Sequence, residues 1–403
     1  MRVSRFAAAM LAIVGSLAVT TAAVAACRNT GSFDAWLNGF RQEALAQGLS
    51  RHIVSVALDG LSLDDRVISR DRKQGVFSQT FLEFSGRMVS GYRLKVGAQK
   101  IKQYGSIFQR VEKQYGVPAE VITAFWALET DFGANTGDFS TLRSLATLAY
   151  DCRRPELFRP QLMDALRLIQ KGDLSPDEMV GAWAGEIGQA QFLPSDYYAR
   201  AVDFDGDGRR DLRTSVPDVL ASSANMLKTF GWRRGEPWLE EVAVPGTLDW
   251  KEADIAIAHP RSYWASHGVT RPGGRAIRAD NFPASLLLPM GRNGPAFLAY
   301  GNFHALLEWN QSLVYVTTVA YLATRFDGAP KVSRGRTEVA SLGVAETREL
   351  QGLLARRGYD VGGIDGTIGA QTRAAVKDVQ MKLGRPADSY PDADLLQRLR
   401  AMR

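Results

Sequence analysis

The sequence has few of the residues on which several large enzyme classes depend. Its 403 residues include only four histidines, which are scattered without the spacing of a metal site and without a Ser or Cys catalytic signature nearby: His52, His259, His267 and His304. It has no Walker or glycine-rich dinucleotide loop. No block of Lys and Arg is interleaved with aromatic residues, so nucleic acid is not an expected partner. These absences argue against histidine-based metal sites, nucleophilic triads and nucleotide chemistry.

Long apolar runs are also missing beyond the N-terminus, so we expect no transmembrane helix in the mature protein. The N-terminus itself is different. Arg2 and Arg5 precede the apolar run Phe6–Val19, and small residues follow up to Cys27. Positive charge, a short apolar run and a small-residue ending are typical of a secretory signal peptide. We therefore predict a signal peptide over residues 1–25 and a mature protein in the periplasm.

Cysteine is scarce, since Cys27 and Cys152 are the only two. In an oxidising compartment such a pair forms one disulfide. Alternatively, Val24-Ala-Ala-Cys resembles the recognition box of bacterial lipoproteins, in which the cysteine carries the lipid anchor. Helical periodicity begins soon afterwards, at Phe33, and leaves almost no tether, so we favour the disulfide and keep lipidation as the alternative.

The composition indicates a globular protein of two or three domains, with 45% hydrophobic and 9% aromatic residues. The net charge of +6 is spread along the chain and points only to an anionic envelope surface. Apolar residues recur at helical spacing from Phe33 to Tyr115, at Leu142–Tyr150, at Pro160–Gln170 and from Phe303 to Arg325. Short apolar runs between turn residues predict a small β insertion within 242–300. The fold class is therefore mainly α (α+β).

The C-terminal part of the sequence is organised separately. Residues 329–343 are polar and rich in Gly, Arg and Ser, which is typical of a linker. Residues 344–403 carry three short amphipathic segments, so we expect a three-helix module. A unit of this size suits binding better than catalysis. The main domain is then expected over residues 30–328.

Glu129 is the most informative single residue. It lies in Val117–Gly133, which has Pro near its start and Gly at its end, as helices do. The helix face that carries it also carries four apolar residues: Ile122, Phe125, Trp126 and Phe132. Such surroundings raise the pKa of a carboxyl group, and a carboxyl that stays protonated near neutral pH is a general acid for glycosidic bonds. The alternative is a glutamate at the rim of the helix that reaches water or an Arg.

An acidic loop follows further along the chain. Its residues match positions one, three, five, six, seven and nine of a calcium loop: Asp203, Asp205, Asp207, Gly208, Arg209 (through its carbonyl) and Asp211. Position twelve is Thr214, and Asp218 can replace the missing acid if the loop is longer. We predict a divalent cation, Ca²⁺, bound by Asp203, Asp205, Asp207, Arg209 and Asp218, against the alternative of a turn that binds nothing.

Two further segments have side chains that suit a sugar ligand. Gln189, Gln191 and Phe192 follow small residues, and amides beside an aromatic ring match sugar hydroxyl and N-acetyl groups. Arg153 and Arg154 offer guanidinium groups for carboxylate or ether oxygens. The alternatives are a packed loop whose amides bind the backbone, and a solvated Arg pair.

Together these segments resemble the lytic murein transglycosylase B family. The resemblance runs from about Phe33 to Arg325 through motifs in one order: Tyr115-Gly-Val-Pro, Trp126-Ala-Leu-Glu-Thr-Asp-Phe-Gly, Arg153-Arg154, Gly188-Gln-Ala-Gln-Phe-Leu-Pro-Ser, Val202-Asp-Phe-Asp-Gly-Asp-Gly and Asn302-Phe with Trp309-Asn310. The C-terminal unit resembles a small peptidoglycan-binding module through Leu350-Gln-Gly-Leu-Leu, Tyr359-Asp, Gly366-Thr-Ile-Gly and Thr372-Arg-Ala-Ala-Val.

The resemblance implies a lysozyme-like core with an N-terminal helical layer, and a lyase that cleaves the bond between N-acetylmuramic acid and N-acetylglucosamine. Glu129 would be the acid and then the base, and a 1,6-anhydro ring would form without water. It further implies substrate contacts for seven residues: Arg153, Arg154, Gln191, Phe192, Trp309 (often tyrosine in the family), Asn310 and Tyr315. The expected partner is the glycan strand, and the expected state is a monomer.

Two other hypotheses remain open at this point. A lysozyme-like hydrolase would pair Glu129 with Asp131 or Glu186. Asp131 follows Glu129 by two residues and should point elsewhere on a regular helix, whereas Glu186 could approach only through the fold. A non-catalytic scaffold would bind glycan with both domains. The products distinguish these hypotheses: anhydro-muropeptides, reducing-end muropeptides or none.

Overall fold

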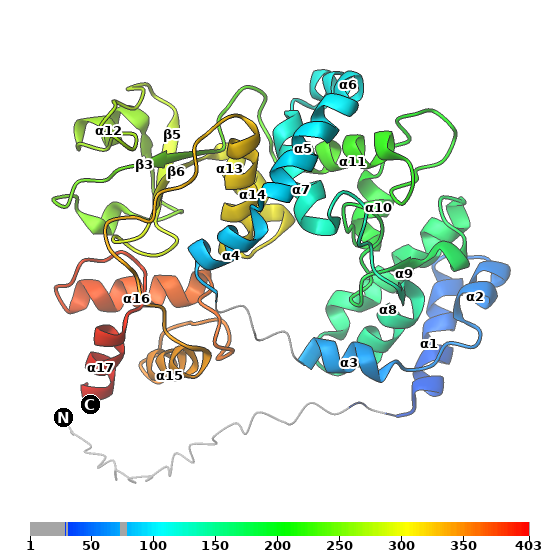
Figure 1. Ribbon diagram of the computed structural model, residues 1–403. Helices are drawn as coiled ribbons and strands as arrows, with labels where there is room; N and C mark the ends of the chain where they lie inside the picture. Colours follow the sequence, from blue (N-terminus) through cyan, green and yellow to red (C-terminus); the bar gives the residue numbers. More distant parts are fainter. Residues whose placement is uncertain (1–28, 30, 73–78, 403) are drawn as a thin grey trace, which may run out of the picture.

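A computed structural model describes residues 29, 31–72 and 79–402 (Figure 1). The predicted signal peptide and Cys27 lie outside these residues. The α-helices of the described chain are α1 (Phe33–Ala46), α2 (Arg51–Leu58), α3 (Asp65–Arg72), α4 (Phe81–Met88), α5 (Gly91–Gln103), α6 (Gly105–Tyr115), α7 (Ala119–Thr130), α8 (Thr141–Tyr150), α9 (Pro155–Lys171), α10 (Pro194–Arg200), α11 (Val216–Thr229), α12 (Arg261–Ser266), α13 (Gly301–Trp309), α14 (Leu313–Phe326), α15 (Val344–Ala355), α16 (Ala370–Lys382) and α17 (Ala393–Ala401). The strands are β1 (Phe139–Ser140), β2 (Val180–Gly181), β3 (Leu239–Val242), β4 (Ala258–Pro260), β5 (Pro283–Leu287) and β6 (Ala296–Tyr300).

Helix α7 is the centre of the molecule. It packs against α5, α6, α11 and α14, and every residue from Val121 to Leu128 is buried. A helix that is apolar all round belongs in the interior of a large domain, which explains why its periodicity is weak. It starts after Pro118 and ends at Asp131, whose backbone is left-handed. The predicted helix over 117–133 is confirmed, slightly shortened at both ends.

The helices α1–α3 form a layer on α8 and α9 at one end of the molecule (Figure 1). Serine side chains cap the first two helices, since Ser32 and Ser50 accept hydrogen bonds from the N–H groups of Ala35 and Ile53. This layer confirms the N-terminal helical layer expected from the sequence.

The described N-terminal residues are anchored beside Cys152. The Cys152 N–H donates to Asn29 Oδ1 (2.9 Å), and the Tyr150 hydroxyl donates to the Gly31 carbonyl (2.8 Å). Asn29 is two residues from Cys27, so this anchoring is compatible with the predicted disulfide, which stays a prediction.

The small β insertion is also present. Strands β3, β6, β5 and β4 form one antiparallel sheet in that order, with Leu239 opposite Ala299 and Ala284 opposite Tyr300. The sheet has its own apolar core around Trp264, Leu286 and Leu298. The sheet lies beside α13 (Figure 1), and the chain then continues into α14, which packs against α7.

The helical segment expected from Phe303 to Arg325 is two helices, α13 and α14, rather than one. Asn310 Oδ1 accepts a hydrogen bond from the Ser312 N–H, and Ser312 caps α14 by accepting from the Tyr315 N–H. These side chains offer the backbone an alternative to continuing the helix. The break sets the position of Tyr315, on the first turn of α14.

The C-terminal module has the three predicted helices, α15–α17, and packs on the sheet region (Figure 1). The half-buried Arg373 donates to the Leu288 carbonyl (2.8 Å). Lys377 Nζ lies 3.0 Å from Asp254 Oδ2, and Arg292 Nη1 lies 3.0 Å from Asp388 Oδ2. The connecting residues are held as well, since Val332 is buried and the Arg336 N–H donates to the Asn293 carbonyl. Part of the connection is therefore bound to the rest of the main domain.

No helix among residues 29, 31–72 and 79–402 combines the length and apolarity needed to cross a bilayer.

Gly181→Ala should test how tightly the loop after β2 is built. An added Cβ would lie 1.9 Å from the Glu186 carbonyl oxygen, which is backbone and has little room to move. We expect the free energy of unfolding, measured with urea, to fall by about 2 kcal/mol or more. Gly39→Ala is the matched control. Its Cβ would meet nothing within 4 Å on exposed α1, so it should stabilise by about 0.5–1 kcal/mol. Equal effects of the two changes would contradict this description of the loop.

Candidate active site

Glu129 lies at the last turn of α7, where α14 and the end of α13 meet that helix. The Tyr315 hydroxyl donates a hydrogen bond to Glu129 Oε1. The Trp309 side chain donates a second hydrogen bond to the same carboxyl group. The structure thus brings together Glu129, Tyr315 and Trp309, which are 186 residues apart in the chain at their widest separation.

The environment of Glu129 favours its neutral form. Burial raises the pKa of the carboxyl from 4.5 to about 7, and the negative charge of Glu186 acts in the same direction. The hydrogen bonds from Tyr315 and Trp309 oppose this rise but do not cancel it. Burial, followed by the charge of Glu129, also raises the pKa of Tyr315 well above its usual value, so the phenol stays a donor. Near neutral pH the site therefore holds a carboxyl proton that it can give away.

Aromatic rings fix the indole that contacts Glu129. Trp309 stacks on Phe125 with ring centroids 4.1 Å apart and meets Phe192 edge-on at 5.5 Å. Phe192 is only 1% exposed, so its ring has no face open to a ligand. The expected contact of Phe192 with a sugar is replaced by a supporting contact with Trp309. The indole of Trp309 still acts as a hydrogen-bond donor towards Glu129, although the family often has tyrosine at this position.

The end of α7 is held in an unusual backbone conformation. Asp131 and Phe132 both have positive φ, 50° and 63°. Such residues persist only where contacts enforce them, and they gather at functional sites. Arg93 supplies one contact, with Nε 2.6 Å and Nη2 3.1 Å from the two Asp131 carboxylate oxygens. Asp131 is thus paired with Arg93, as expected of a residue that points away from Glu129.

The two glutamines of the amide-rich loop have different roles: Gln189 is structural, whereas Gln191 has an oxygen available to a ligand. The Gln189 side chain accepts from Trp126 Nε1 and donates to the Arg213 carbonyl, both at 2.8 Å, and its own carbonyl accepts from Thr130 Oγ1. Gln189 is therefore fully used in packing against α7. Gln191 has φ of 53° and donates through Nε2 to the carbonyls of Thr136 and Gly188, which leaves its Oε1 for a ligand.

Arg153 and Arg154 are bound to a buried acid and are not a solvated pair. Arg153 Nη1 lies 2.7 Å from Asp71 Oδ2, and Arg154 Nη2 contacts the other oxygen of the same carboxylate. Burial opposes the charge of Asp71, but the two guanidinium groups still hold its pKa below the usual range. Both arginines retain exposed surface, so a ligand contact would add to the Asp71 pairing. Asn310, by contrast, uses its side chain in the turn before α14.

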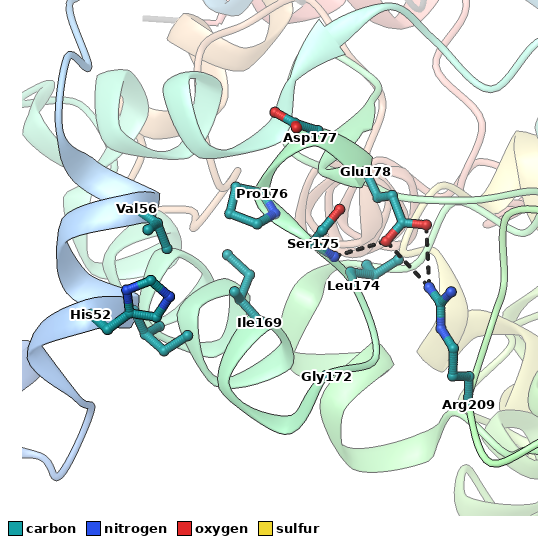
Figure 2. Close-up of a pocket in the computed structure, with 11 residues that line it drawn as sticks. His52, Val56, Ile169, Gly172, Leu174, Ser175, Pro176, Asp177, Glu178 and Arg209 are labelled. Carbon is teal, nitrogen blue, oxygen red and sulfur yellow. Dashed lines mark hydrogen bonds and ion pairs between the residues drawn. The ribbon is translucent and has the colours of Figure 1, made fainter.

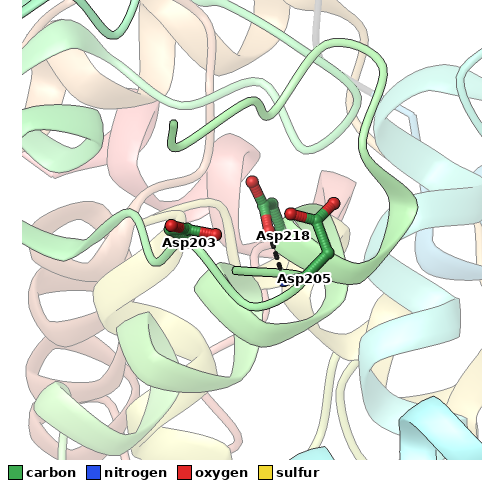
Figure 3. Close-up of side chains that lie close together, drawn as sticks. All are labelled: Asp203, Asp205 and Asp218. Atoms are coloured by element: carbon green, nitrogen blue, oxygen red, sulfur yellow. Dashed lines mark hydrogen bonds between the residues drawn. The ribbon is translucent and has the colours of Figure 1, made fainter. Parts of the chain in front are cut away.

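The acidic loop brings three of the predicted cation ligands together. Oxygen atoms of Asp203, Asp205 and Asp218 all lie within 4.8 Å of one another (Figure 3). Asp218 is fully buried, and its oxygens accept from the N–H groups of Phe204 and Asp211. Burial raises the pKa of Asp218, and the negative charge of Asp205 acts in the same direction.

Of the other two predicted ligands, Asp207 lies outside this cluster, and Arg209 is expected to bind through its backbone carbonyl. Asp207 Oδ1 accepts from the Arg209 N–H, and the Arg209 side chain contacts Glu178. Asp218, and not Thr214, lies beside Asp203 and Asp205, as expected if the loop is longer.

A surface cavity of about 670 Å³ lies elsewhere, between α2 and the residues that follow α9 (Figure 2). His52 and Val56 face Ile169 and Pro176 across it, and the Glu178–Arg209 pair closes one end (Figure 2). None of its lining residues belongs to the Glu129 group. Its volume therefore gives no argument about the chemistry of Glu129.

The sequence pattern missed several residues that shape the site. The pairing of Arg93 with Asp131 and of Asp71 with Arg154 leaves no local signal, because the partners are 38 and 83 residues apart. Glu186 was considered only as a possible second carboxylate. Its proximity to Glu129 became visible only in the folded chain.

Comparison with known proteins agrees with this geometry. The model of the transglycosylase SLT domain matches residues 32–324, and that of a putative peptidoglycan binding domain matches residues 344–399. The membrane-bound lytic murein transglycosylase B of Escherichia coli (strain K12) is 31% identical over 249 residues, 59% of this chain. The aligned part spans 65% of the length of that relative.

Solved structures are similar over more of the chain. The crystal structure of SltB3 from Pseudomonas aeruginosa in complex with NAG-anhNAM-pentapeptide has a TM-score of 0.85 and 40% identity, covering 92% of this chain and 100% of that one. Escherichia coli Slt35 in complex with calcium has a TM-score of 0.62 and 26% identity, covering 72% and 92%. With a family model matched over most of its length and Glu129 on the central helix, the chain belongs to the lytic murein transglycosylase B family and ends in a peptidoglycan-binding domain.

Proposed function

We propose that the protein is a peptidoglycan lytic transglycosylase that cleaves the bond between N-acetylmuramic acid and N-acetylglucosamine without water. The observation that carries this proposal is the buried Glu129 carboxyl, held by Tyr315 and Trp309 on the central helix, whose burial raises its pKa to about 7. The relative crystallised with NAG-anhNAM-pentapeptide supports the substrate class, because that ligand contains an anhydro sugar.

In the first step Glu129 gives its proton to the glycosidic oxygen as the C1–O bond breaks. A carboxyl with a pKa of about 7 is well suited to this role, because a substantial fraction of it is protonated at neutral pH and it still ionises readily. As the proton leaves, Oε1 gains negative charge, and the Tyr315 hydroxyl already donates to that atom. The hydrogen bond from Trp309 acts on the same charge. Both bonds should therefore strengthen towards the transition state.

In the second step the Glu129 carboxylate removes the proton from the muramyl 6-hydroxyl, whose oxygen attacks C1 and closes the 1,6-anhydro ring. Glu129 ends protonated, so one residue completes the cycle. Positive charge at C1 can be stabilised by the substrate's own 2-acetamido oxygen. This mechanism needs no second carboxylate, so Asp131 can remain paired with Arg93.

Substrate contacts are proposed for residues that the structure leaves available. Gln191 offers Oε1, while Arg153 and Arg154 keep exposed guanidinium surface next to Asp71. The C-terminal module would bind the same polymer, as its family description suggests. The working form is proposed to be a periplasmic monomer, exported by the N-terminal signal and carrying the Cys27–Cys152 disulfide.

We further propose that the acidic loop binds Ca²⁺ through Asp203, Asp205 and Asp218. Oxygen ligands of this kind suit a hard cation, and a cation would offset the mutual repulsion of the carboxylates. The loop also supports the site, since the Leu212 and Arg213 carbonyls accept from the Gln189 backbone and side chain. Slt35, which was solved with calcium, is a relative with a similar fold.

Glu129→Gln should abolish cleavage of purified sacculi while glycan binding persists. The amide keeps the shape of the side chain but cannot act as an acid, so we expect a loss of at least about 10³-fold in turnover. Tyr315→Phe should lose much less, about tenfold, because it removes one hydrogen bond to the carboxylate. Mass spectrometry should find anhydro-muropeptides from the wild type. Reducing-end muropeptides as the main product would indicate a hydrolase, and an active Glu129→Gln variant would exclude the mechanism.

The same variant should be more stable than the wild type at alkaline pH. The pKa of Glu129 is raised on folding, so the unfolded chain loses this proton first, and the free energy of unfolding falls as pH rises from about 4.5 to 7. The loss is on the order of 3 kcal/mol. The Glu129→Gln variant does not lose this stability. The difference in unfolding free energy between the variant and the wild type, measured with urea, should therefore favour the variant more at pH 8 than at pH 5. A difference that does not depend on pH would show that Glu129 ionises normally.

Added Ca²⁺ should raise the melting temperature of the wild-type protein. At a concentration 100 times the dissociation constant the stabilisation is about 2.7 kcal/mol. Asp203→Asn should remove most of the shift, because its carboxylate belongs to the cluster. Asp207→Asn is the matched control and should keep most of the shift, since Asp207 lies outside the cluster. The same response in all three proteins would locate the ion elsewhere.

A further inference from the structure

We propose that Glu186 is a substrate-positioning residue of this site, whose buried Oε2 accepts a hydrogen bond from an N–H or O–H group of the bound glycan beside Glu129. The proposal rests on the proposed function of Glu129 as the acid and base. It gives a role to a carboxyl group that the reaction does not use as its proton donor.

The backbone around Glu186 is fixed on both sides. The Ala182 N–H donates to the Glu186 carbonyl (2.9 Å), and the next residue, Ile187, pairs with Gly181 and Phe192 in two isolated bridges. Gly185, just before it, has φ of 97° and could not be replaced without strain. A side chain on such a frame has few positions available, so its carboxyl is held in place before a ligand arrives.

The two oxygens of this carboxyl differ in their surroundings. Oε2 is buried and has no hydrogen-bond partner among the described residues. The backbone N–H groups of Glu186 and Ala184 interact with the carboxyl and favour its charged form. Leaving a buried acceptor unpaired costs about 1–3 kcal/mol, which proteins usually avoid unless the group has a use. A donor brought by the ligand would satisfy Oε2.

The charges around Glu186 come from two other elements. Glu129, on α7, is close enough for the negative charge of Glu186 to raise its pKa. Arg154, before α9, attracts the Glu186 carboxylate and is itself held by Asp71. Burial raises the pKa of Glu186, while the two N–H groups and Arg154 favour its ionisation. Glu129 has no cationic partner among its described neighbours, whereas Glu186 has Arg154, so the surroundings favour the negative charge of the pair on Glu186.

This arrangement does not suit Glu186 as the second carboxylate of a hydrolase. A general base must take a proton, and the backbone hydrogen bonds and the charge of Arg154 act against protonation of Glu186, while burial, the larger influence, raises its pKa. The same hydrogen bonds and charge suit an acceptor that stays ionised throughout the cycle. Glu186 would thus orient the sugar and hold the proton on Glu129, without exchanging a proton itself.

Glu186→Gln is the informative change, because it keeps the size of the side chain and removes its charge. With the neighbouring negative charge gone, Glu129 ionises at lower pH, so the alkaline limb of the kcat/KM profile on purified sacculi should move to lower pH. KM should rise about tenfold, because the ligand loses a charged acceptor. The products should stay anhydro-muropeptides. Glu120→Gln is the matched control: this half-buried carboxyl, at the far end of α7, also has a pKa raised by burial. Its variant should keep the wild-type profile and KM.

Three results would overturn the proposal. One is a Glu186→Gln variant with wild-type KM and pH profile. Another is a loss of turnover as large as that of Glu129→Gln, because Glu186 would then take part in the chemistry. The third is a shift from anhydro to reducing-end products. Full activity of Glu129→Gln would instead refute the proposed function itself, whatever Glu186→Gln does, so the two failures can be told apart.

A conservative variant guards against loss of the fold. Glu186→Asp keeps the charge but withdraws the oxygens, so it should raise KM while leaving the pH profile near that of the wild type. Melting temperatures of both variants identify any general unfolding. If Glu186→Asp shifted the pH profile as far as Glu186→Gln, the charge of Glu186 would not be the cause and the proposal would fail.

Binding to the inactive enzyme identifies the donor. Glu129→Gln and the double variant with Glu186→Gln are titrated with an N-acetylglucosamine oligosaccharide and with its N-deacetylated counterpart. An affinity loss confined to the acetylated sugar assigns the contact to the amide N–H. A similar loss with both sugars assigns it to a hydroxyl group. No loss with either sugar would overturn the contact.

Discussion

The burial of one carboxyl group at the end of α7 is the constraint on which the site depends. Burial is the largest influence on the pKa of Glu129, and it arises because α7 is enclosed by four other helices. A helix at the surface could carry the same residue but would let water stabilise the charge. Helices α5, α6, α11 and α14 therefore serve the chemistry indirectly, by making α7 an interior helix.

The loop that contains Gln189 transmits this constraint to the rest of the domain. Gln189 binds α7 through Trp126 and Thr130, and it binds the segment after the acidic loop through Leu212 and Arg213. A cation that tightened the acidic loop would therefore also tighten the support of Glu129. Gly188 is needed in this contact, since a Cβ there would lie 2.4 Å from the Leu212 carbonyl oxygen.

The sequence predicted those parts of the fold and site whose signal is local. Helix α7, the C-terminal three-helix module and the spacing of Asp203 and Asp205 all lie within short segments, where periodicity and loop spacing apply. Pairings such as Arg93 with Asp131 join distant segments and leave no pattern in either one. Phe192 is an example of the same limit. The sequence predicts that it contacts a sugar, but its ring is buried against Trp309, and these two roles look alike in sequence.

The choice between ring closure and hydrolysis depends on what the second carboxyl can do. Two carboxyl groups with different neighbours influence each other, and Glu186, unlike Glu129, has an arginine, Arg154, that favours its charged form. Glu129 must then serve as both acid and base, which requires the nucleophile to approach from the side where its proton was delivered. A hydroxyl group on the same sugar can do this, because it stays attached after the bond breaks. The asymmetry of the pair thus favours an internal nucleophile over a water molecule held by a second base.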